Sequence, residues 1–325
     1  PHRRLHLRLR SIGLLLLLLL LATPATHSKT LALPEQRKEK ASSSKGEMFA
    51  YQKGGDIEAG TSGGAGAAPT RGLYPGMTES PELRWALIRK IYVILSLQLL
   101  LTAVVAAVVV KVRAIPHFFV STNAGFGLYI FLIIFPFIVL CPLYFYRQKH
   151  PVNLLLLAVF TIAISFAVGM TCAFTSGAGS PFMISISDSE AFAIPLATII
   201  TFYARCKVIL EAAILTTAVV FSLTAYTFWA ARRGQDFSFL GPFLFASLIM
   251  LLVFGFIQIL FPLGKLSHMI YGALAALIFS GYIVYDTDNI IKRFTYDEYV
   301  WAAVSLYLDV INLFLALLTL FRAGD

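Results

Sequence analysis

The sequence is poor in charge and in the residues that build metal or redox sites. Only 13% of its 325 residues are Asp, Glu, Lys or Arg, whereas soluble domains carry roughly 25%. It has three cysteines, Cys141, Cys172 and Cys206, and no two of them form a Cys-x-x-Cys pair. This spacing disfavours structural-metal and disulfide chemistry, so we expect no cofactor.

Common catalytic and nucleotide-binding motifs are also missing. The chain has no His-Glu-x-x-His and no Gly-x-x-x-x-Gly-Lys segment, the motifs of zinc hydrolases and of phosphate-binding loops. We therefore expect that the protein is not an enzyme.

A nucleic-acid partner is not expected either. Residues 1–47 hold +6 of the net charge of +9, and the rest of the chain has no basic stripe interleaved with aromatics.

Long apolar runs dominate the sequence instead. Hydrophobic residues make up 58% of the chain, and the mean hydropathy is +0.79. A helix that spans a bilayer needs about 20 predominantly apolar residues. Seven segments meet this need: residues 91–110, 118–146, 152–175, 208–229, 239–263, 266–285 and 299–321. The sequence therefore predicts an all-α, polytopic membrane bundle of about seven transmembrane helices, with the lipid bilayer as its surroundings.

The amino-terminal part differs from this pattern. Residues 1–47 combine several arginines with a leucine run over 14–21, which is typical of a secretory signal. The alternative is a non-native extension that precedes Met48. Residues 48–84 are rich in Gly and Pro and predict a flexible cytosolic tail, because they offer little apolar surface to bury. The transmembrane bundle itself takes residues 85–325.

The stretch between the third and fourth predicted spans is too polar to be a span. Residues 178–206 contain Asp188, Glu190 and Pro195. We interpret them either as a loop with an interfacial helix over 191–204 or as an insertion into the bundle.

Basic residues near the span ends number nine on the side of the amino terminus and six on the other. This difference favours a cytosolic amino terminus.

Two aspartates lie in or beside the apolar runs. Asp286 closes the run that begins at Ser280, and Asp309 lies in the middle of the last span. A charged carboxylate in hydrocarbon is costly, so an intramembrane acid marks a functional site. Their helices follow one another, and antiparallel packing would bring the two carboxyls together. Such a pair cannot ionise twice cheaply. We expect it to share a proton, to respond to pH and to attract Ca²⁺ transiently once deprotonated.

Each candidate residue also has a simpler interpretation. Asp286 is alternatively an ordinary acid at the membrane interface, and Asp309 an interior acid satisfied by a neighbouring Tyr or Arg. Glu211, near the start of the fourth span, is either a third intramembrane acid or an interfacial residue paired with Lys207. Arg147, after the second span, is either a counter-ion that closes the site or an anchor of the positive-inside type.

Three segments resemble a known family. They are Val-Ile-Leu-Glu-Ala-Ala at 208–213, Phe-Ser-Gly-Tyr-Ile-Val-Tyr-Asp at 279–286 and Ser-Leu-Tyr-Leu-Asp-Val-Ile-Asn-Leu-Phe at 305–314. Together they resemble the Bax inhibitor motif family, or lifeguard proteins. The run Asp-Thr-Asp-Asn-Ile-Ile at 286–291 is similar to the plant-type branch. The resemblance covers about residues 48–325 and implies seven helices, with a central last helix wrapped by the others.

The resemblance also implies a function. Proteins of this family are associated with a pH-sensitive Ca²⁺ leak, usually across the endoplasmic reticulum membrane, and with suppression of stress-induced cell death. Their di-aspartyl pH sensor matches Asp286 and Asp309. The basic residue that bonds the pair in the closed state matches Arg147, and the acid that opens the fourth helix matches Glu211.

We therefore expect a pH-sensitive calcium leak channel of the endoplasmic reticulum, with calcium as the permeant ion. The Golgi, vacuolar or plasma membrane is the alternative location. The alternative function is a non-conducting membrane adaptor that regulates cell-death or stress signalling through membrane-protein partners. Residues 1–47 and 178–206 have no counterpart in the family pattern, which favours interpreting the latter as an insertion.

Overall fold

The structure is a computed structural model, and it describes residues 72–75, 77, 80–112, 114–146, 149, 151–176, 193–261 and 263–324. The described residues form helices and their connections, without a strand. The helices are α2 (Pro81–Lys111), α3 (Ala114–Ser121), α4 (Asn123–Phe145), α5 (Val152–Ser176), α7 (Ala193–Arg232), α8 (Leu240–Leu260), α9 (Lys265–Lys292), the 3-10 helix η2 (Tyr296–Glu298) and α10 (Tyr299–Gly324). Seven of these segments are long and apolar enough to cross a membrane, which confirms the predicted all-α bundle.

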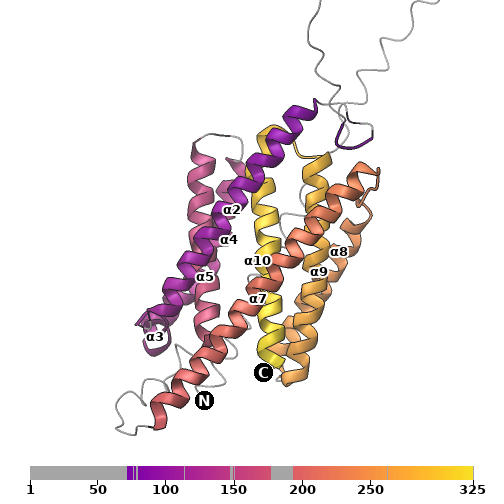
Figure 1. Ribbon diagram of the computed structural model, residues 1–325. Helices are drawn as coiled ribbons and strands as arrows, with labels where there is room; N and C mark the ends of the chain where they lie inside the picture. Colours follow the sequence, from indigo (N-terminus) through magenta and orange to yellow (C-terminus); the bar gives the residue numbers. More distant parts are fainter. Residues whose placement is uncertain are drawn as a thin grey trace, which may run out of the picture.

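The seven long helices run alternately in opposite directions through one bundle (Figure 1). The start of α2 lies at the same end as the connections α4–α5, α7–α8 and α9–α10, and we call this end the amino end of the bundle. The α8–α9 connection and the end of α10 lie at the opposite end, which we call the carboxyl end.

Helix α10 lies in the middle of the bundle (Figure 1). The buried share of its most apolar stretch is 72%, whereas the same share is 22% in α2 and 17% in α7. It packs most extensively on α9 and also contacts α7, α2 and α5. Gly272 of α9 permits the close approach, because a Cβ there would lie 2.8 Å from the backbone nitrogen of Leu320 and 2.9 Å from the carbonyl oxygen of Ala316. The expected central last helix is confirmed.

The second predicted span is divided in the structure into α3 and α4. The side chain of Thr122 accepts a hydrogen bond from the backbone nitrogen of Gly125 at 3.1 Å and so caps the start of α4. Gly125 allows this turn, since a Cβ there would lie 2.2 Å from the carbonyl oxygen of Phe118. Helix α4 then continues through Pro136 and Pro142.

Other helices also extend beyond the predicted spans, and α2 begins at Pro81, before the predicted start at residue 91. Helix α7 already begins at Ala193, so the last part of the predicted loop or insertion continues into the membrane helix. Helix α9 continues past Tyr285 to Lys292, and Asp286 is therefore a helical residue inside the bundle and not the end of a helix. The predictions for residues 1–71 and for residues 178–192 fall outside the described residues.

Candidate functional site

The carboxyl groups of Asp286 and Asp309 meet inside the bundle. The two side chains hydrogen-bond to each other, and they are only 7% and 5% exposed. A hydrogen bond between two carboxyl groups needs a proton on one of them, because a carboxylate only accepts hydrogen bonds. The structure thus joins the two acids that the sequence singled out.

Helix geometry sets the depth of the carboxyl pair. At 1.5 Å per residue, Asp286 lies about 9 Å before the end of α9 and Asp309 about 15 Å after the start of α10. Both of these helix ends belong to the amino end of the bundle (Figure 1). Since the hydrocarbon core of a bilayer is about 30 Å thick, the pair lies between the membrane centre and the amino end.

A few polar groups surround the pair. Asn289, one turn further along α9, forms a side-chain hydrogen bond with Asp286. Tyr282 is close enough to interact electrostatically with both acids. Two buried atoms, Oδ2 of Asp309 and the hydroxyl oxygen of Tyr282, have no hydrogen-bond partner among the described residues. Buried polar atoms without a partner are costly, so a polar ligand at these two atoms would be favourable.

The carboxyl pair offers few ligands for a metal ion. No group of three or more His, Cys, Asp or Glu side chains gathers in the described part of the chain. Ca²⁺ takes about six to eight oxygen ligands, and two carboxyl groups supply at most four oxygens.

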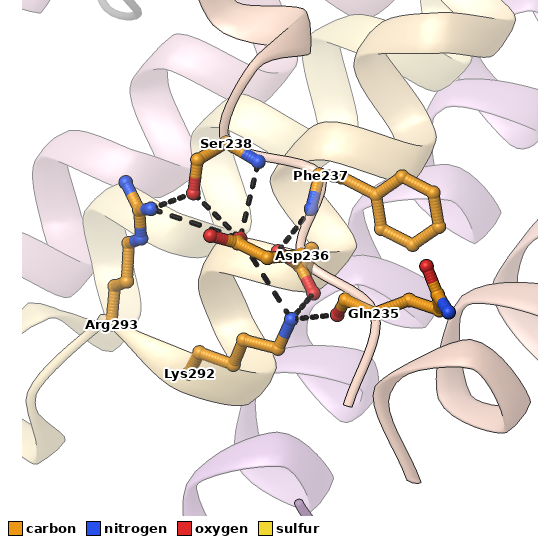
Figure 2. A network of polar contacts seen from close by, with 7 residues as sticks. Gln235, Asp236, Phe237, Ser238, Lys292 and Arg293 are labelled. Atoms are coloured by element: carbon orange, nitrogen blue, oxygen red, sulfur yellow. Dashed lines mark hydrogen bonds and ion pairs between the residues drawn. The ribbon is translucent and has the colours of Figure 1, made fainter. Parts of the chain in front are cut away.

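A second polar cluster fastens the α7–α8 loop to the end of α9 (Figure 2). Oδ1 of Asp288 lies 2.6 Å from Nζ of Lys292, and the Asp288 side chain is almost fully buried. Oδ2 of Asp288 accepts a hydrogen bond from the backbone nitrogen of Phe237 at 3.3 Å. Lys292 also donates to the carbonyl oxygen of Gln235. One buried ion pair therefore holds loop and helix together.

Asp236 completes this cluster from the loop side (Figure 2). Its Oδ1 accepts hydrogen bonds from the hydroxyl of Ser238 at 2.6 Å and from the Ser238 backbone nitrogen at 3.1 Å. It also lies 3.9 Å from Lys292 Nζ and 3.9 Å from Arg293 Nη2. The hydrogen bond from the Ser238 hydroxyl is the main cause that lowers the pKa of the Asp236 carboxyl below its ordinary range. The charges of Lys292 and Arg293 lower it further. We call Asp236, Ser238, Asp288, Lys292 and Arg293 the loop clamp.

The start of α2 is attached to the link between the two aspartate-bearing helices. Arg84 is 3% exposed and donates from Nη1 to the carbonyl oxygen of Phe294 at 2.6 Å. Lys90 lies over the ring of Tyr299, with Nζ 3.4 Å from the ring centroid. In the sequence, Arg84 and Lys90 are seen only as cations that flank a span. The acceptor of Arg84 is a backbone oxygen, and such an acceptor leaves no signal in the sequence.

A third polar cluster joins α2, α5 and α10 in the core. Oγ1 of Thr102 lies 2.8 Å from the hydroxyl of Tyr307 and 3.0 Å from Oγ of Ser165. Gln98 donates to Oγ1 of Thr161 at 3.0 Å. All five side chains are buried. Sequence reasoning missed them, although a spacing of four residues puts Gln98 beside Thr102, and Thr161 beside Ser165, on one helix face.

Of the other two predicted site residues, the structure describes only Glu211, which does not join the carboxyl pair. Glu211 forms an ion pair with Lys207 at 3.4 Å, and both side chains are largely exposed, as the interfacial interpretation expects. Arg147 lies outside the described residues, so its role as counter-ion stays a prediction. The preceding part of α4 does reach α10, where the rings of Tyr144 and Trp301 pack edge to face with centroids 5.4 Å apart.

The fold and the site together define a class, a polytopic α-helical membrane protein with a carboxyl pair on its last two helices. The family described as "Inhibitor of apoptosis-promoting Bax1" matches residues 84–187 and 190–325. The chain therefore belongs to the Bax inhibitor, or lifeguard, family, and it is an integral membrane protein.

Curated relatives cover most of the chain. "Protein LIFEGUARD 2" of Arabidopsis thaliana is 64% identical over 253 residues, which are 78% of this chain and 94% of the relative. "Protein lifeguard 4" of Mus musculus is 36% identical over 244 residues, 75% of this chain and 87% of the relative. The "Golgi anti-apoptotic protein" of Vaccinia virus (strain Lister) is 35% identical over 247 residues, which are 76% of this chain and 89% of the relative.

Proposed function

We propose that this protein is a pH-sensitive Ca²⁺ leak channel of an intracellular membrane that suppresses stress-induced cell death. One observation carries the proposal: two carboxyl groups on α9 and α10 share a hydrogen bond inside a membrane bundle. The anti-apoptotic name of the viral relative supports the cellular role. The proposal assigns the chain no catalysed reaction.

The shared proton acts as the switch. With the proton in place, the pair carries one negative charge and links α9 to α10. Without it, two negative charges at about 4 Å repel each other by about 4 kcal/mol at an effective dielectric constant of about 20. That repulsion weakens the contact between the helices, and the doubled charge attracts a divalent cation. Both effects favour conduction as the pH rises through the titration of the pair.

The test is Ca²⁺ flux into dye-loaded liposomes that contain the purified chain, measured between pH 5 and 8. We expect flux that rises with pH for the wild type. A protein with both Asp286→Asn and Asp309→Asn should give a flux that no longer depends on pH, because neither amide titrates. Asp297→Asn is the matched control, since Asp297 is an exposed acid on the α9–α10 link, and its pH response should equal that of the wild type.

Two outcomes contradict the proposal. If the double variant keeps the wild-type flux and pH dependence, the pair is not the gate. If the wild type shows no flux above that of empty liposomes while cells expressing the double variant remain protected from stress, the protein acts as a non-conducting adaptor through membrane-protein partners.

We propose the endoplasmic reticulum as the membrane. The Golgi is the alternative, because the viral relative carries that organelle in its name. A fluorescent fusion expressed at low level, imaged with markers for both organelles, decides between them. The vacuolar and plasma membranes are distinguished in the same experiment.

A further inference from the structure

A long groove lies between α2 and α7, with α10 and α5 as its floor. Its volume is about 810 Å³, within the range of roughly 300–1,000 Å³ that is typical of small-molecule sites. Figure 1 shows α2 and α7 crossing the bundle as two slanted helices, with α10 between them. These are the two spanning helices with the least burial, at 22% and 17%.

The lining of the groove is apolar along almost its whole length. Its walls are aliphatic and aromatic side chains with a few hydroxyls. Among the described residues that line it, Lys111 carries a charge, and it lies at the carboxyl end of the bundle. The floor includes Val310 and Ile311, which are only 5% and 4% exposed. The groove therefore combines one cationic end with a hydrocarbon interior.

The length and the lining of the groove indicate what fits in it. Its α2 wall extends from Tyr92 to Lys111, about 28 Å at 1.5 Å per residue. The lining is apolar over this length, and the end at Lys111 is positively charged. A hydrocarbon chain with an anionic group at one end therefore complements the groove in both polarity and charge.

We propose that this groove binds a phospholipid, with one acyl chain along α10 and the phosphate at Lys111. The groove crosses the hydrocarbon core of the bilayer, which is about 30 Å thick. Lys111 lies at the level of the headgroups at the carboxyl end, so the lipid belongs to that leaflet. Binding itself does not depend on the proposed channel function.

The test uses the full chain in nanodiscs that contain a phosphatidylcholine with a photoactivatable diazirine in one acyl chain. After illumination, mass spectrometry of the peptides locates the cross-links. We expect cross-links to the α10 peptide that contains Val310 and Ile311, because lipids that only surround the protein do not reach these buried side chains. Cross-links confined to the outer faces of the helices overturn the proposal.

Matched variants separate the groove from the surrounding lipid. Ala213→Phe places a ring in the groove, and we expect it to reduce α10 cross-linking severalfold. Ala218→Phe lies on the same helix at an exposed position outside the groove and should leave the yield unchanged. Equal yields in the two variants contradict the proposal. The thermal unfolding midpoint of each variant, measured alongside, shows that both are folded.

A second pair of probes tests the phosphate contact. Lys111→Gln should lower cross-linking by the phosphatidylcholine severalfold but leave cross-linking by a diacylglycerol with the same diazirine unchanged, because the latter has no phosphate. If both probes respond equally, Lys111 does not bind the headgroup and the assignment of a phospholipid is wrong. A photoactivatable sterol that labels the α10 peptide more strongly than either probe overturns the acyl chain as the occupant.

Discussion

Asp286 and Asp288 are only two residues apart on α9 but have different partners. Two residues turn a helix by about 200°, so Asp286 contacts Asp309 of α10 while Asp288 contacts Lys292 and the α7–α8 loop. Asp288 lies against a cation, whereas Asp286 lies against a second acid. Under the proposed function, the response to pH belongs to the carboxyl pair, and the loop clamp has a structural role.

Replacing Lys292 should destabilise the protein. Lys292→Met leaves the buried Asp288 carboxylate without its cation, and such a loss costs about 3–5 kcal/mol for a buried pair. We expect the lower end of that range, because Lys292 itself is 14% exposed. Thermal unfolding in detergent measures the effect. The double variant with Asp288→Asn should recover most of the lost stability, and a Lys292→Met protein as stable as the wild type would contradict this account of the clamp.

The Asp236 arm of the loop clamp should loosen only in strong acid. Hydrogen bonds from Ser238 lower the pKa of Asp236 in the folded protein, so its contribution is complete above the unfolded value of about 3.9 and is lost as the pH falls through the lower folded value. Hydrogen exchange of the α7–α8 loop, corrected for the intrinsic effect of pH, should be constant from pH 5 to 8 and increase below pH 4. Asp236→Asn should give the loosened exchange at every pH. Faster hydrogen exchange of the loop near neutral pH would mean that the loop clamp responds to pH in that range, which would contradict this prediction.

At the scale of whole helices, α9 has two parts with different tasks. Its first part is pressed against α10 at Gly272, where backbone meets backbone. Its last turns carry Asp286, Asn289 and the residues of the loop clamp. A helix that is tightly packed at one end and held by polar contacts at the other can open at the polar end while staying attached. Under the proposed function, the gate lies in the amino-end half of the bundle.

A methyl group at Gly272 should separate α9 from α10. The Cβ of Gly272→Ala would lie 2.8 Å from a backbone nitrogen of α10 that cannot move alone, and overpacking of this kind costs about 1–3 kcal/mol. The unfolding midpoint in detergent is the measurement. Gly127→Ala is the matched control, because a Cβ there meets nothing within 4 Å, and it should leave the midpoint unchanged or raise it slightly. Equal midpoints for both variants would rule out the close approach.

At the scale of the whole molecule, burial decreases from the centre outward. The helix that carries Asp309 is the most buried, whereas α2 and α7 expose most of their surface to the membrane. As a whole, the central helix α10 contacts α9, α7, α2 and α5. The partners of the Asp309 carboxyl itself lie on α9.

The carboxyl terminus should lie on the side of the membrane opposite to the amino-terminal tail. Helix α10 is a complete span of about 39 Å, and it is the seventh of an odd number of spans. Basic residues favour a cytosolic tail by nine to six. In sealed microsomes, protease should remove an epitope placed in residues 48–71 and spare one appended after Asp325. Digestion of both epitopes would indicate that the last segment turns back within the membrane.

The sequence by itself determined the number of membrane spans and their helical type. Apolar runs of membrane length have few alternatives to helices, because a backbone in hydrocarbon must satisfy its own hydrogen bonds. An acid inside such a run is costly, which made Asp309 stand out, and the order of the last two helices suggested its pairing with Asp286. The family resemblance added the role of that pair and the central position of the last helix.

Only the tertiary structure decided which polar groups meet. The ends of α7 and α9 lie beyond the apolar runs, because packing against neighbours extends a helix past the hydrophobic pattern that predicts it. The loop clamp, the contact of Arg84 with a backbone oxygen and the cluster around Thr102 each join residues from separate helices. The groove between α2 and α7 depends in the same way on how two helices diverge. The physical reason is that sequence periodicity fixes the face of a helix on which a residue lies, whereas its partner is fixed by the way the helices pack.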